Sequence, residues 1–203
     1  MPAEQPREQP AEQPAHRNRL VVMAGPTAVG KGTVAGYVRE HFPQVWLSVS
    51  VTTRPSRPGE VDGVHYGFVD DAEFERLRRT GALLEWAVVH GRAKYGTPRA
   101  PVERALAEGR RALLEIDLQG ARQVREQMPD ALFVFLAPPS WQELVRRQLG
   151  RGTEDAAERE VRLETARAEL AAASEFDVTV VNDDVPRAAE ELVSLMCTTI
   201  PAR

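Results

Sequence analysis

A glycine-rich segment near the N-terminus has the residue types and spacing of a phosphate-binding loop. It reads GPTAVGKGT and follows the apolar run LVVMA at 20–24. Glycines let the backbone wrap around an anion with several N–H groups pointing inward, and a helix that follows presents its positive N-terminal end. The lysine supplies a cation for the β- and γ-phosphates. A chance glycine-rich turn is the alternative, which the strand, loop and lysine together disfavour. The segment comprises Gly25, Pro26, Thr27, Ala28, Val29, Gly30, Lys31, Gly32 and Thr33.

The residue after the loop lysine departs from the usual pattern. Most such loops place Ser or Thr there as a magnesium ligand, whereas this chain has Gly32 followed by Thr33. The order GKGT resembles nucleoside monophosphate kinases of the adenylate kinase type. We therefore expect the Mg²⁺ that accompanies ATP to be held through water or by Thr33.

Two carboxylates occupy positions suited to chemistry. Asp117 follows the apolar run RALLEI at 111–116, where P-loop enzymes hold magnesium, usually through water. It also suits the cap of a helix beginning at Gln119, and both roles are compatible. Glu85 lies within LLEWAVV at 83–89. Its carboxylate fits the N1–H and 2-amino edge of guanine, but periodicity alone favours the solvated face of a half-exposed strand.

A segment rich in Pro and Gly, TTRPSRPGEVDGVHY, carries Arg54 and Arg57. Two guanidinium groups held on a turn can bind one phosphate through paired hydrogen bonds. The alternative is a solvated basic loop. Tyr66 and Tyr95 offer additional hydroxyl donors, or pack against a small sheet.

Arginines are concentrated on two helices expected after the capping-box pair Ser140 and Glu143. The second of these helices is expected over about 156–173. Helices joined by the GRGTED turn resemble a mobile lid that brings charge to a transferring phosphoryl group and excludes water. Charge pairing between residues four apart on solvated helices is the alternative. The arginines are Arg146, Arg147, Arg151, Arg159, Arg162 and Arg167.

Composition limits the class of protein. The chain has 203 residues, a net charge of −4 and 42% hydrophobic residues, which is sufficient for one compact unit with a core. Its charge does not favour nucleic acid or an anionic membrane as partner. Cys197 is the single cysteine, so the sequence predicts no disulfide framework. Residues 1–17 repeat EQP and are expected to be a disordered tail, and the absence of an apolar leader or span predicts a cytoplasmic enzyme.

The remaining pattern predicts an α/β fold. Apolar runs alternate with helical segments, which favours a five-stranded parallel sheet with helices on both faces. Thr97 is expected to cap a helix that begins at Pro98. Asn182 follows the last strand, at the sheet edge where ligands bind. The five strands are expected at 20–24, 45–53, 111–116, 131–136 and 176–181.

Together, these segments resemble the guanylate kinase family over about residues 19–199. The resemblance rests on separated motifs: GPTAVGKGT, SVSVTTRPSRPGEVDGVHY, LLEW, KYGT, IDLQG, GRGTE and VVND. It implies a P-loop nucleoside monophosphate kinase fold over 18–203, with a GMP-binding subdomain at about 50–97 and a helical lid at about 146–167. It also implies transfer of the γ-phosphoryl of MgATP to GMP, giving ADP and GDP, in purine nucleotide metabolism.

The resemblance also implies roles for individual residues. Lys31 is the P-loop lysine, and Arg147, Arg151 and Arg162 are the lid arginines near the ATP phosphates. Arg54, Arg57, Tyr66 and Tyr95 are the clamp on the GMP phosphate. Glu85 reads guanine with hydroxyl groups from Ser50 and Thr97, Glu115 stands where many members have Asp, and Asn182 lies near adenine.

Other functions remain open at this point. A monophosphate kinase for another base and a non-catalytic module that binds phosphorylated peptides share much of this pattern, although the intact lysine loop and lid arginines disfavour the module. A regulatory GTPase would use D-x-x-G, which 117–120 fits, but the chain has no N-K-x-D motif. The sequence leaves the oligomeric state open.

Overall fold

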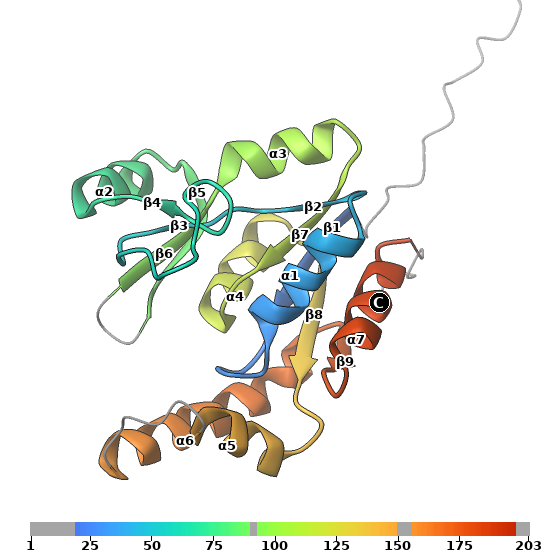
Figure 1. Cartoon of the computed structure of the whole chain (residues 1–203). Helices are drawn as coiled ribbons and strands as arrows, with labels where there is room; N and C mark the ends of the chain where they lie inside the picture. The colour runs from blue at the N-terminus through green and yellow to red at the C-terminus, as the bar shows by residue number, and fades with distance from the viewer. Residues whose placement is uncertain (1–18, 90–92, 150–155, 198–203) are drawn as a thin grey trace, which may run out of the picture.

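The core of the protein is a five-stranded parallel sheet in the order β2-β7-β1-β8-β9 (Figure 1). The computed structural model describes residues 19–89, 93–149 and 156–197. The prediction of this sheet is confirmed. Its strands are β1 (Leu20–Ala24), β2 (Val45–Leu47), β7 (Arg111–Glu115), β8 (Leu132–Ala137) and β9 (Val178–Val181).

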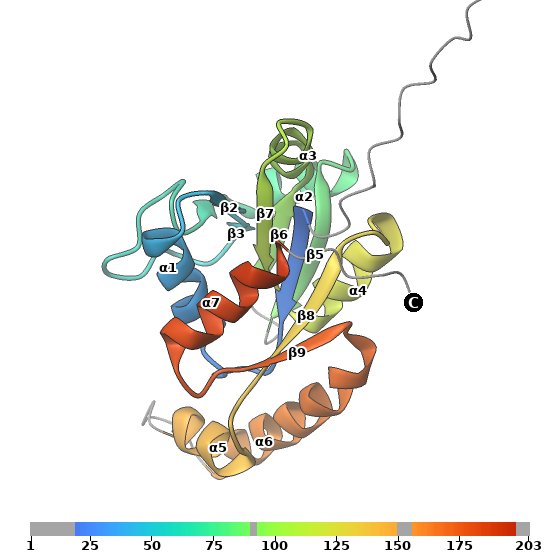
Figure 2. The same ribbon diagram turned by 90° about the vertical axis from the view of Figure 1, so that its right-hand side faces the viewer.

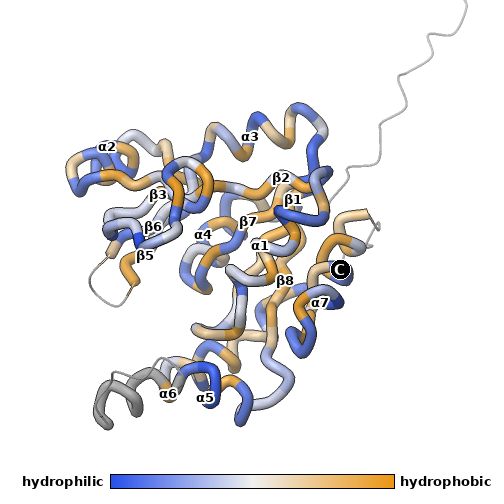
Figure 3. Tube along the Cα trace, viewed as in Figure 1, coloured by the Kyte–Doolittle hydropathy of each residue, from blue (hydrophilic) through white to orange (hydrophobic). Residues whose placement is uncertain are grey.

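Helices cover both faces of this sheet because its central strands are apolar on both sides (Figures 2 and 3). Along β1, Val21 and Met23 pack into the cluster built with α1 and α7, whereas Val22 faces the cluster that includes residues of α3 and α4. All three side chains are fully buried. The helices are α1 (Lys31–His41), α3 (Arg99–Ala107), α4 (Leu118–Gln127) and α7 (Val185–Leu195).

A second, four-stranded sheet has the order β4-β3-β6-β5 and is covered by α2. Phe74 of α2 is fully buried against Val51 and Leu83 of this sheet. The elements are β3 (Val51–Thr52), β4 (Gly67–Phe68), α2 (Asp71–Arg79), β5 (Leu83–Val89) and β6 (Ala93–Pro98), all within or next to the range 50–97.

The prediction of a single strand over 45–53 is wrong. The run forms two strands, since β2 ends at Leu47 in the large sheet and β3 begins at Val51 in the small one. The Ser48 N–H still bonds to Leu113 O of β7 at 3.0 Å, and the chain then leaves the large sheet. An alternating polar pattern is equally compatible with one longer strand, so the sequence alone did not show this crossing.

Two further helices, α5 (Trp141–Leu149) and α6 (Ala156–Ala171), lie on the side of the core away from the small sheet (Figure 1). Glu143 N bonds to Ser140 Oγ at 3.1 Å, as expected for the first turn of α5. The helix expected to 173 ends at Ala171 and continues as a 3₁₀ turn, Ala172–Glu175. No helix in the described part of the chain is both long and apolar enough to span a membrane.

Candidate active site

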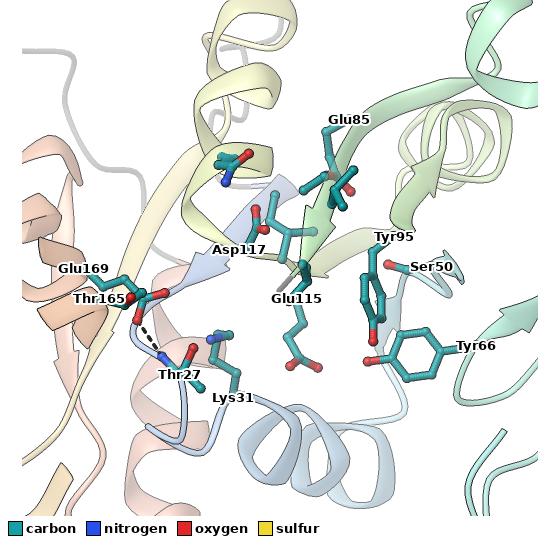
Figure 4. Close-up of a pocket in the computed structure, with 15 residues that line it drawn as sticks. Thr27, Lys31, Ser50, Tyr66, Glu85, Tyr95, Glu115, Asp117, Thr165 and Glu169 are labelled. Atoms are coloured by element: carbon teal, nitrogen blue, oxygen red, sulfur yellow. Dashed lines mark hydrogen bonds between the residues drawn. The ribbon is translucent and has the colours of Figure 1, made fainter. Parts of the chain in front are cut away.

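A cavity of about 320 Å³ separates the P-loop from the small sheet (Figure 4). It lies beyond the carboxyl ends of β1 and β7, where ligands bind in open parallel sheets. Its volume is within the range of small-molecule sites, about 300–1,000 Å³. The polar lining comes from the P-loop, both sheets and their connections, α4 and α6: Thr27, Lys31, Ser50, Tyr66, Glu85, Tyr95, Glu115, Asp117, Gln119, Thr165 and Glu169.

The P-loop backbone includes two residues in the left-handed region, a glycine and, less usually, an alanine. Gly30 has φ of 100° and Ala28 has φ of 66°, both in the left-handed region. A Cβ at Gly25 would lie 2.3 Å from Leu136 O, so only glycine fits there. Lys31 Nζ donates to Gly25 O at 2.7 Å and Pro26 O at 3.2 Å. Burial lowers the pKa of Lys31, while the negative charge of Glu115 opposes this shift.

Arg147 and Asn182 lie behind the P-loop and do not line the cavity. Asn182 is 2% exposed, and its Nδ2 donates to Val29 O at 2.8 Å. Arg147 donates to the same carbonyl at 3.0 Å and to Asn182 O at 3.2 Å, while Glu143 Oε1 accepts from its Nε at 2.8 Å. These bonds fix the loop backbone at Val29.

Glu169 of α6 contacts the P-loop directly, which the sequence analysis missed. Its Oε2 accepts a 2.8 Å hydrogen bond from the Thr27 N–H. A carboxylate therefore occupies one donor of the anion-binding loop. The two residues are 142 positions apart in a chain with many charged helices, so no local signal marks this glutamate.

Glu85 is buried, at 4% exposed, and its carboxylate is aimed at the cavity from β5. The Thr97 hydroxyl donates to Glu85 Oε1 at 2.6 Å. Burial raises the pKa of Glu85 to about 7, the Thr97 hydrogen bond opposes the shift, and the Asp117 charge adds to it. Thr97 was expected to cap α3, and that expectation is wrong, because Pro98 is the N-cap and Thr97 pairs with Glu85 within the sheet.

We expect the stability of the ligand-free protein to fall as pH rises from about 4.5 to about 7 through Glu85. Its folded pKa is about 7 against an ordinary value of 4.5, so the folded state binds the proton more tightly. Protonated Glu85 therefore adds on the order of 3 kcal/mol to the free energy of unfolding; this contribution is complete below pH 4.5 and is lost as pH rises through 7. Denaturant unfolding of wild type and Glu85→Gln across this range measures it. Parallel profiles for the two proteins would contradict the assignment.

The predicted phosphate clamp is only partly assembled. Arg54 Nε donates to the Tyr95 hydroxyl at 3.1 Å, and the guanidinium lies 4.9 Å from the Tyr66 ring centroid. Its two terminal nitrogens bond to both Glu60 carboxylate oxygens at 2.6 Å, which holds the pKa of Glu60 at about 2. Arg57 is exposed, and its hydrogen bonds to Glu60 come from its backbone: its N–H donates to Glu60 Oε2 at 2.7 Å and its carbonyl accepts from Glu60 N–H at 3.0 Å. Glu60 was not among the residues predicted from the sequence, although an acid three residues after Arg57 is a local signal for such a pair.

Two carboxylates approach the P-loop lysine from β7 and its carboxyl end. Glu115 lines the cavity, and burial raises the pKa of its carboxyl while Lys31 opposes the shift. Asp117 Oδ1 accepts from Gly120 N–H at 2.7 Å, so it caps α4, which begins at Leu118 and not at Gln119. Thr33 is exposed in the first turn of α1.

Comparisons with known proteins identify the family. A family model described as guanylate kinase matches residues 17–199. A guanylate kinase of Leifsonia xyli subsp. xyli (strain CTCB07) is 66% identical over 180 residues, covering 89% of this chain and 71% of the relative. One from Thermobifida fusca (strain YX) is 62% identical over 178 residues, covering 88% and 90%.

The chain belongs to the guanylate kinase family.

A solved structure agrees with this membership. The guanylate kinase of Anaplasma phagocytophilum has a TM-score of 0.71 at 35% identity, covering 88% of this chain and 83% of that one. The fold is therefore that of P-loop nucleoside monophosphate kinases, as predicted. Guanylate kinases phosphorylate GMP to GDP at the expense of ATP, so this protein is a phosphotransferase.

Two expected site residues are not placed, since Arg151 and the side chain of Arg162 lie outside the described residues.

Proposed function

We propose that GMP and ATP meet in the cavity between the two sheets, with the guanine base at Glu85 and the ATP phosphates at the P-loop. One observation carries this proposal: Lys31, at the end of the P-loop, and buried Glu85 of the small sheet face the same cavity. A buried carboxylate requires donors, and a backbone cradle with a lysine requires an anion. GMP and the phosphates of ATP supply these complementary groups.

Guanine recognition is proposed to rest on Glu85, Ser50 and Thr97. Guanine presents N1–H and a 2-amino group, which together fit the two oxygens of one carboxylate. Thr97 already donates to Glu85 Oε1, so it fixes the carboxylate plane. Glu115 lies in the same cavity and is proposed as an additional acceptor for the base.

The acceptor phosphate is proposed to bind Arg54, Arg57, Tyr66 and Tyr95. Arg54 and both tyrosines are already in contact with one another. Arg57 is exposed, and its side chain would turn toward the acceptor phosphate when GMP binds. Their positive charge and hydroxyl donors offset the repulsion between the acceptor and the incoming phosphoryl group. The segment 50–97 thus acts as the GMP-binding subdomain.

The donor phosphates are proposed to bind the backbone N–H groups of residues 25–33 and Lys31. As charge spreads over the transferring group, positioning and fixed cations lower the barrier more than a protein base does. Arg151 and Arg162, in the lid segment 146–167, are proposed to complete this charge, and Arg147 of the same segment would join them only by leaving its bonds to Val29 O and Asn182 O. Asn182 is proposed to support the adenine side of the donor site from behind the loop, where it holds Val29.

The residues around the loop fit a magnesium ion carried by ATP. Mg²⁺ keeps most of its waters and takes one or two carboxylates together with substrate phosphates. Asp117 lines the cavity beside Lys31, and Thr33 is exposed at the start of α1. Among the described residues no cluster of three acidic, His or Cys side chains forms a cage for a metal by itself. Asp117 and Thr33 would hold the ion, mainly through water, and the ion would supply positive charge to the phosphates.

A coupled assay of ADP release with ATP and each nucleoside monophosphate tests the proposal. We expect GMP to be the preferred acceptor by at least about 10-fold over AMP, as one bidentate base contact provides about 1–3 kcal/mol of discrimination. Preference for another monophosphate would indicate a kinase for a different base. Nucleotide binding without ADP release would indicate a non-catalytic module.

A further inference from the structure

Helix α4 is attached directly to the free edge of β5, the strand that carries Glu85. β5 is the outer strand of the small sheet, so one row of its backbone polar groups lacks a strand partner. Gln123 fills this place at Trp86, where its Nε2 donates to Trp86 O at 2.7 Å and its Oε1 accepts from Trp86 N at 3.1 Å. Gln127, one helical turn later, donates to Leu84 O at 2.7 Å. The two glutamines therefore hold the backbone on both sides of Glu85.

The Glu85 side chain also lies against α4, at a glycine. A Cβ on Gly120 would lie 2.4 Å from Glu85 Oε2 and 2.9 Å from its Cδ. Gly120 lies in the first turn of α4, and no unusual φ explains a glycine there. Glycine within a helix costs about 0.5–1 kcal/mol relative to alanine, so the position calls for another reason. The reason in this structure is space for the carboxylate.

We propose that Gly120, Gln123 and Gln127 of α4 are positioning residues that set the base selectivity of the GMP site by fixing the Glu85 carboxylate. The inference rests on the proposed role of Glu85. Glu85 Oε1 is bound by Thr97 and Oε2 lies on the bare backbone of Gly120, so the carboxylate plane is determined from two sides. The same helix is capped by Asp117, which lines the cavity together with Lys31, so α4 holds both the Glu85 carboxylate and an acidic group of the P-loop side.

The first test replaces Gly120 with alanine and uses Gly36→Ala as the matched control. Gly36 lies in α1, and its added Cβ would have no atom within 4 Å. In Gly120→Ala the methyl group displaces the Glu85 carboxylate. A shift of about 1 Å can cost up to about 100-fold, so we expect kcat/KM for GMP to fall at least about 10-fold. Preference over AMP falls with it, the KM for ATP stays unchanged, and Gly36→Ala retains both properties.

Two further measurements separate positioning from folding. Gln123→Leu removes both bonds to Trp86 without adding bulk at Glu85, and we expect a smaller loss of GMP preference at an unchanged KM for ATP. In a Glu85→Gln background, Gly120→Ala should add little further loss, as both changes act through one group. Wild-type selectivity in folded Gly120→Ala and Gln123→Leu, or fully additive losses, would overturn the positioning role alone. A wild-type enzyme without GMP preference would overturn the proposed function itself.

Discussion

Replacing Lys31 with alanine is expected to lower kcat by about 10²–10³-fold, the usual cost of removing one preorganised donor to developing charge. The ammonium now bonds to two carbonyls of its own loop, at Gly25 and Pro26, and is available to phosphate oxygens in the same cradle. Burial lowers its pKa, so removal of this charge relieves a desolvation cost in the ligand-free fold. This gain offsets the loss of the two hydrogen bonds, so the melting temperature should change little while kcat falls.

Lys94→Ala is the matched control, because Lys94 is the only other lysine in the chain. Lys94 lies on β6, and its Nζ pairs with Asp71 at 2.8 Å and Glu75 at 3.0 Å, both on α2. It does not line the cavity. We expect near wild-type turnover from this variant. Near-normal kcat in Lys31→Ala, measured by ADP release at saturating ATP and GMP, would remove Lys31 from the mechanism.

The parts of the structure that sequence reasoning predicted are those with local causes. The P-loop is predictable because glycine spacing, the preceding strand and Lys31 lie within one short segment. The strands of the large sheet are predictable because burial on both faces makes them continuously apolar. The β2–β3 run was mispredicted because the crossing depends on pairing with distant strands: Ser48 still bonds to Leu113 of β7, whereas Val51 pairs with Gly96 of β6.

The parts that sequence reasoning missed depend on partners far along the chain. Periodicity placed Glu85 on a solvated face, because an exposed and a buried acid look the same within an alternating strand. Its burial depends on Thr97 and on the helix at Gly120. Glu169 reaches Thr27 across 142 positions, and nothing in its own helix marks it.

The charged side chains that line the cavity are mostly acidic, which opposes the binding of anionic nucleotides. Glu85, Glu115, Asp117 and Glu169 line the space in which we propose that two anionic nucleotides bind, and among the described lining residues Lys31 is the one cation. Burial raises the pKa of Glu85 and Glu115, which reduces the negative charge before ligands bind. In the proposed complex, the arginines of the small sheet and lid and the magnesium that accompanies ATP would balance the charge of the phosphates.

Replacing Glu85 with glutamine is expected to lower the preference for GMP over AMP by about 10–100-fold, which corresponds to about 1–3 kcal/mol. If the amide oxygen accepts the Thr97 hydroxyl, as Oε1 now does at 2.6 Å, the amide NH₂ faces the guanine donors. Two donors then oppose each other across the base contact. Parallel measurements of kcat/KM for GMP and AMP at fixed ATP give the selectivity.

The pH dependence of the same parameter supplies an independent check. In the proposed site the ionised carboxylate binds guanine, and the pKa of Glu85 is about 7, so kcat/KM for GMP should fall up to about tenfold per unit below pH 7. The acceptor phosphate also titrates near pH 6, so the informative quantity is the difference between wild type and Glu85→Gln. Glu126→Gln, at an exposed position of α4, should follow the wild-type profile. Unchanged GMP selectivity in Glu85→Gln, with the same pH profile as wild type, would mean that another group reads the base.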